Sequence, residues 1–181
     1  MLLLPDTELG PTLLDRARHA IEHELGVKGV SPAEDLRLAN RGATFVTLRL
    51  SGDLRGCIGS VRAQRALGDD VVVNAIGAAT RDPRFLPVEA HELNDIRVEV
   101  SLLSEPQFLE FADEDDLLAQ LRPGIDGLML FGSCRSATFL PQVWEQLSDP
   151  RDFLDALLRK GGLRSMQNVM AATYTVRKWR E

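Results

Sequence analysis

One stretch of sequence decides the fold: TFVTLRL at residues 44–50, SGD at 51–53 and LRGCIGSV at 54–61. The β-branched, alternating residues on each side predict two strands, and Ser-Gly-Asp is typical of a turn, so we expect a β-hairpin. Gly56 and Gly59 flank a Cys-Ile pair in the second strand. Because glycine in a strand often marks a bulge or a close backbone approach, we expect open space beside Cys57 and Arg55.

The face on which Cys57 lies depends on the length of the turn. A two-residue turn puts Cys57 opposite Leu48, where it is a buried small hydrophobe. A three-residue loop puts it opposite Thr47, on a less buried face shared with Arg55. The second register also sets Arg49 against Arg55, at a cost on the order of 0.2–1 kcal/mol. We favour it because it gives the hairpin a continuous apolar face.

The rest of the chain shows helix and strand patterns in irregular order. Helical periodicity predicts helices at residues 7–25, 67–80, 114–121 and 150–160, and alternation predicts strands at 96–103, 124–131, 137–140 and 173–179. The helix at 67–80 is apolar nearly all round, so we expect it to be buried. Without a regular βαβ rhythm, the predicted fold is α+β, a mostly antiparallel sheet flanked by helices.

Length, composition and charge favour one cytoplasmic domain over residues 1–181. The chain of 181 residues is 44% hydrophobic and 27% charged, which is ordinary globular usage. Two cysteines, Cys57 and Cys134, are too few for a disulfide framework. We expect no signal peptide and no membrane association, because no stretch is long and apolar enough. The net charge of −6 disfavours nucleic acid as a partner.

Metal and cofactor motifs give no positive prediction. His19-Ala-Ile-Glu-His23 matches a zinc-protease pattern, but both histidines fall opposite the apolar stripe of the first helix, so we predict no metal. The two cysteines form no C-x-x-C pair, and no phosphate-binding glycine loop is found. We therefore predict no cofactor.

Six motifs in one order resemble the AMMECR family, whose bacterial members are called AmmeMemoRadiSam system protein A. They are LRGCIGS (54–60), AATRDPRFLPV (78–88), VEVSLLSEP (98–106), GIDGLMLF (124–131), ATFLPQVW (137–144) and FLDALLRKGGL (153–163). The chain departs from the family pattern at its last motif, where KGGL replaces KAGL and residues 164–169 lack an expected tryptophan. Ala66 stands where the family usually has proline.

The resemblance implies a larger lobe built on a β-sheet, a smaller lobe and a cleft between them, with a lobe boundary that the sequence does not assign. It also implies linkage with a Memo-like protein and a radical S-adenosylmethionine protein. It points to no particular reaction. Two classes of function therefore stay open: a ligand-binding or adaptor component of that system, or an enzyme acting on a small anionic substrate in the cleft.

The candidate site is built around Cys57, the candidate nucleophile or ligand contact. The candidate ligand-binding residues are Arg55, Gly56, Gly59, Asp82, Arg84 and Glu99. We expect Asp82 and Glu99 to orient the guanidinium groups of Arg55 or Arg84, which suit a small anionic ligand. The alternative is that these charges form a structural ion-pair network that holds the lobes together.

Overall fold

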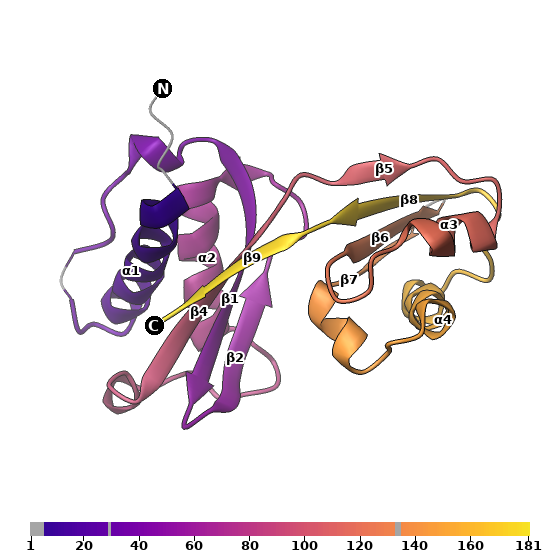
Figure 1. Ribbon diagram of the computed structural model, residues 1–181. Coiled ribbons are helices and arrows are strands. Elements are labelled where there is room, and N and C mark those ends of the chain that lie inside the picture. The colour runs from indigo at the N-terminus through magenta and orange to yellow at the C-terminus, as the bar shows by residue number, and fades with distance from the viewer. Residues whose placement is uncertain (1–5, 29, 133–134) are drawn as a thin grey trace. The chain divides into compact units, whose positions relative to one another are not determined.

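The computed structural model describes residues 6–28, 30–132 and 135–181, so Cys134 lies outside the described residues (Figure 1). The chain divides into two compact units. The larger unit comprises the described residues up to Leu103 together with Arg177–Glu181, and the smaller unit comprises Ser104–Val176. Each unit has its own hydrophobic core.

The larger unit contains one sheet and two main helices. Its elements are α1 (Asp6–Glu24), η1 (Leu36–Leu38), β1 (Arg41–Leu50), β2 (Asp53–Gly59), β3 (Arg65–Ala66), α2 (Leu67–Thr80), η2 (Ala90–Glu92), β4 (Ile96–Leu103) and β9 (Val176–Arg180). The strand order is β2-β1-β4-β9, and β3 pairs with β1. Strand β1 pairs antiparallel with both β2 and β4.

The smaller unit contains a second sheet and two helices. Its elements are β5 (Gln107–Leu109), α3 (Glu114–Gln120), β6 (Gly127–Gly132), β7 (Arg135–Phe139), η3 (Pro141–Glu145), α4 (Pro150–Gly161) and β8 (Val169–Tyr174). The strand order is β5-β8-β6-β7, with antiparallel pairing. Asp149 caps α4, and Gly162 ends it in the left-handed conformation, as the sequence Asp-Pro at one end and Gly-Gly at the other predicts.

The two faces of the larger sheet have different chemistry. Val46, Leu48, Val98 and Val100 are fully buried in one core with residues of α1 and α2. Because side chains alternate along a strand, the residues between them point to the opposite face. We call this the polar face and define it by Thr47, Arg49, Cys57, Arg97 and Glu99.

At Cys57 the hairpin has the register that we favoured, but a different turn and a bulge produce that register. The turn is Ser51-Gly52, with φ values of 53° and 92°, as in the mirror-image turns that match strand twist. A β-bulge at Arg55 then adds one residue and restores the pairing of Cys57 with Thr47. The predicted three-residue loop was therefore wrong, and so was the pairing of Arg49 with Arg55, because Arg49 pairs with Leu54.

The α+β fold with antiparallel sheets flanked by helices is confirmed, and α2 has the bounds that we predicted. The single strand predicted at 173–179 was wrong: β8 and β9 are separate strands of different sheets, with Thr175 between them. The short strands β3 and β5 were not predicted. Among the described residues, every helix is too short or too polar to cross a membrane.

Candidate functional site

Cys57 lies on the edge strand β2, half-buried and fixed on three sides. The Thr47 hydroxyl donates to its sulfur at 3.3 Å. On the outer edge of the sheet, its backbone N–H donates to Asp82 at 2.8 Å, and its carbonyl accepts from Arg84 at 3.4 Å. The loop after α2 thus satisfies, with side chains, backbone groups that an edge strand would otherwise leave unpaired.

Asp82 and Arg84 form a charged pair directly beside the backbone of Cys57. The guanidinium of Arg84 donates to the two carboxylate oxygens of Asp82 at 3.0 and 2.7 Å. This hydrogen bonding, with the N–H groups of Cys57 and Arg84, holds the pKa of Asp82 well below its usual value against the effect of burial. Asp82 raises the pKa of Arg84, and the Cys57 side chain adds to that effect.

Arg55 is fully engaged elsewhere. It donates to both oxygens of Glu92, at 2.7 and 2.9 Å, and to the carbonyls of Leu86 and Pro87. The contact with Glu92 raises the pKa of Arg55, and the contact with Arg55 lowers the pKa of Glu92. Arg55 therefore fastens the segment 86–92 to β2. This favours the structural alternative for Arg55 over the anion-binding one.

Glu99 lies in one cross-strand row with Thr47 and Cys57, because Thr47 pairs with both. Its side chain is 8% exposed, and its carboxylate forms ion pairs with Arg49 and Lys178, each at 3.1 Å. Burial raises the pKa of Glu99, but Lys178 and Arg49 outweigh burial, and the pKa is lowered. The prediction that Glu99 orients Arg55 or Arg84 was wrong, whereas the prediction for Asp82 and Arg84 is supported by their contact.

The two glycines of the motif mark close approaches, and the expected open space is filled. A Cβ atom on Gly56 would lie 2.1 Å from the carbonyl oxygen of Ala78 in α2. A Cβ atom on Gly59 would lie 2.2 Å from the ring of Phe45. Glycine is thus needed at these positions because neighbouring groups pack directly against the β2 backbone.

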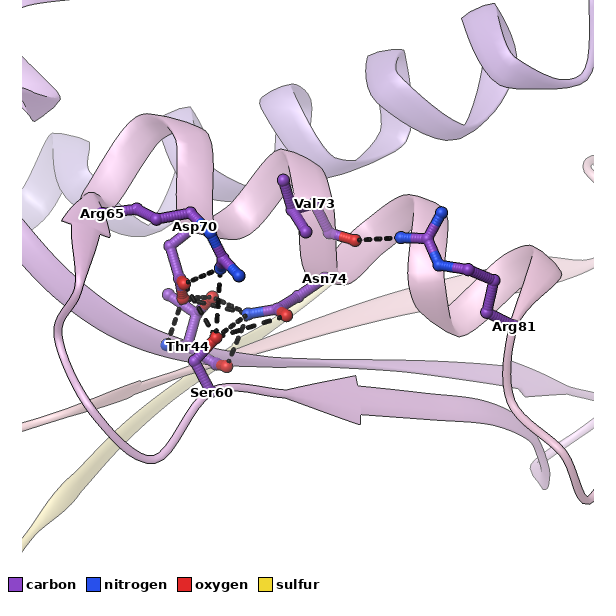
Figure 2. A network of polar contacts seen from close by, with 7 residues as sticks. All are labelled: Thr44, Ser60, Arg65, Asp70, Val73, Asn74 and Arg81. Carbon is purple, nitrogen blue, oxygen red and sulfur yellow. Dashed lines mark hydrogen bonds and ion pairs between the residues drawn. The ribbon is translucent and has the colours of Figure 1, made fainter.

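A buried polar network that the sequence analysis missed lies at the end of the same hairpin (Figure 2). Asp70 is fully buried and accepts five hydrogen bonds. The donors are the Thr44 N–H and hydroxyl (both 2.8 Å), the Asn74 amide (2.9 Å), the Ser60 hydroxyl (2.8 Å) and the Arg65 guanidinium (2.7 Å). Asp70 also lies in the first turn of α2, where the helix dipole favours a carboxylate. The available signal in the sequence was the pair Asp70 and Asn74, two polar residues one turn apart on a mostly apolar helix.

The remaining candidate residues give no metal site. Within residues 6–28, 30–132 and 135–181, no three His, Cys, Asp or Glu side chains are grouped so that they could hold a metal ion. His19 and His23 are half-buried, and a ring nitrogen of His23 lies 3.1 Å from the Lys28 carbonyl oxygen.

Comparisons with known proteins agree with this architecture. The AMMECR1 family model matches residues 14–179. A protein of Methanothermobacter thermautotrophicus is 42% identical over 158 residues, which are 85% of this chain and 82% of that protein. Protein MK0488 of Methanopyrus kandleri is 38% identical over 162 residues, which are 86% of this chain and 78% of that protein. The crystal structure of protein PH0010 from Pyrococcus horikoshii matches with a TM-score of 0.83 at 30% identity, and covers 96% of this chain and 92% of that one.

Proposed function

Because the chain belongs to the AMMECR1 family, we propose that it is a cytoplasmic ligand-binding or adaptor component that works with Memo-like and radical S-adenosylmethionine proteins. The proposed binding surface is the polar face of the larger sheet. It would take an anionic group, carried by a small ligand or by a partner protein. The catalytic alternative uses the same face and is treated separately below.

The observation that carries this proposal is the charge on the polar face. Arg49 and Arg97 are cross-strand partners, and Lys178 reaches the same Glu99 carboxylate that Arg49 binds. Two like charges directly opposite each other destabilise a sheet. The face thus carries three cations, Arg49, Arg97 and Lys178, and one buried carboxylate that pairs with two of them. This arrangement keeps positive charge available for an anion.

The surroundings of Cys57 also favour binding. Its contacts in the described part of the chain are with Thr47, Asp82 and Arg84. Asp82 already accepts from a backbone N–H and from a guanidinium, so it is poorly suited to take a proton from the thiol. Cys57 is therefore proposed to contact the bound group, with its position fixed by the β2 edge.

The test is complex formation with the purified Memo-like and radical S-adenosylmethionine proteins of the same organism, measured by size-exclusion chromatography with light scattering and by calorimetry. We expect a complex with at least one of them, weakened about five- to tenfold by Arg97→Gln, since a charge at an interface contributes on the order of 1 kcal/mol. The matched control is Arg37→Gln, an exposed arginine of the same unit. Absence of any complex, or equal weakening by both variants, would contradict the proposal.

One observation favours the enzyme alternative: the Thr47 hydroxyl donates to the Cys57 sulfur, and the Arg84 guanidinium donates to the carbonyl of the same residue. A cation and a hydrogen-bond donor favour a thiolate, which is the nucleophilic form. Saturable turnover of carboxylate or phosphate esters by the isolated protein, abolished by Cys57→Ser, would support this alternative. Tight partner binding without such turnover would support the adaptor.

A further inference from the structure

The smaller unit contains a pocket of about 440 Å³ where α4 ends and the chain leads into β8. Its polar lining comes from Arg135, Arg164, Ser165, Gln167 and Asn168. Glycines and aliphatic side chains complete the wall. The volume lies within the roughly 300–1,000 Å³ that is common for small-molecule sites.

The charge of this lining distinguishes it from a second pocket, which lies in the larger unit. Among the described residues that line the smaller unit's pocket, two are arginines and none is acidic. The pocket in the larger unit, about 490 Å³, sets Arg16 and Arg37 among three acidic side chains, Asp15, Glu34 and Asp35. A pocket with two guanidinium groups and no carboxylate attracts anions even in a chain of net charge −6.

The two arginines are available to bind a ligand. Arg135 donates through one nitrogen to the carbonyl of Gly162 at 2.8 Å. This hydrogen bond fixes the guanidinium and leaves its other N–H donors available to a ligand. That bond also occupies a carbonyl at the C-terminal end of α4, where partial negative charge would oppose an anion. The side chain of Arg164 forms no hydrogen bond or ion pair with the described part of the chain, although it lines the pocket.

We propose that this pocket binds the phosphate group of a small molecule. Arginine forks match phosphate oxygens, and two guanidinium groups match the charge of a phosphate monoester better than that of one carboxylate. Ser165, Gln167 and Asn168 supply neutral donors. Most of the lining comes from within residues 162–169, the segment in which this chain departs from the family pattern. The proposal does not depend on the function proposed for the polar face.

The experiment is a titration of the full chain, labelled with nitrogen-15, with inorganic phosphate at constant ionic strength. We expect saturable shifts of the backbone amide signals of residues 162–168. Arg164→Gln should weaken binding at least tenfold, because it removes a charge-assisted hydrogen bond. Arg159→Gln, the same charge change at an exposed residue of α4 outside the pocket lining, should leave it unchanged. No saturable shift, or equal weakening by both variants, overturns the proposal.

Two further measurements complete the test. The thermal midpoint of Arg164→Gln should equal that of the parent protein, so that lost binding is not lost folding. A nucleoside monophosphate should compete with inorganic phosphate at the same amides. If a single-stranded oligonucleotide shifts these amides and inorganic phosphate does not, the pocket serves a nucleic-acid backbone and the small-molecule proposal is overturned.

Discussion

At the scale of single residues, the position of Cys57 is set by its backbone more than by its side chain. Asp82 and Arg84 hold its N–H and its carbonyl, and Thr47 holds its sulfur. Most unpaired cysteines fill tight places in a core. Cys57 is instead half-buried on the polar face, beside a guanidinium, which is the setting in which a thiol becomes reactive.

We therefore expect Cys57 to react with iodoacetamide in the folded protein faster than Cys134 does, as measured by peptide mass spectrometry. Arg84→Gln should slow the reaction of Cys57 several-fold, because it removes the cation beside the thiol. The control is Arg37→Gln, which removes another arginine paired with an aspartate. Slow, equal labelling of both cysteines would show that Cys57 is not activated.

At the scale of elements, the Asp70 network fastens β1, the loop that follows β2, and β3 to α2 (Figure 2). Asp70→Asn replaces an acceptor of five hydrogen bonds with a group that also donates, so some donors lose their partner. We expect a loss of about 3–5 kcal/mol in the free energy of unfolding in urea, the usual effect of breaking a buried charged contact.

The control for this variant is its neighbour in the sequence. Asp69→Asn makes the same charge change in the same helical turn, but Asp69 is exposed, and its loss should cost at most about 1 kcal/mol. Similar losses for the two variants would mean that the helix dipole, and not the buried network, makes Asp70 important.

The same elements show what a sequence can predict. Helix α2 and strands β1 and β4 follow from periodicity, because their hydrophobic residues recur at helical or strand spacing. The bulge at Arg55 could not be predicted, since it depends on how the Ser51-Gly52 turn fits the twist of the strands. The contacts of Arg55 with Glu92 and of Glu99 with Lys178 join positions far apart in sequence, and only the folded chain brings them together.

At the scale of the whole molecule, the lowered carboxyl pKa values found among residues 6–28, 30–132 and 135–181 all lie in the larger unit: Asp35, Asp82, Glu92, Glu99 and Glu181. A group with a lowered pKa in the folded state stabilises the fold above its unfolded pKa, near 4 for Asp and Glu. That stability is lost as pH falls towards the folded pKa, because the unfolded chain takes up protons first. The free energy of unfolding of the larger unit should therefore change little near neutral pH and fall below about pH 4–5.

Each unit carries its own tryptophan, so this expectation can be measured separately in the two units. Trp144 is buried in the smaller unit against Phe153, and Trp179 of β9 packs against Gly10 of α1 in the larger unit. In a Trp144→Phe variant, fluorescence reports the larger unit, and in Trp179→Phe it reports the smaller one. Both variants must first give a folded signal at pH 7.

Acid titration should then change the Trp179 signal at a higher pH than the Trp144 signal. The paired carboxylates Asp82, Glu92 and Glu99 hold the edge loop and the polar face in place, and protonation removes these contacts before the smaller unit is affected. Hydrogen exchange of the unmodified protein at pH 4 should agree, with β1 losing protection before β6. If the two fluorescence transitions coincide, the units unfold as one cooperative body; if Trp144 changes first, other groups govern acid stability.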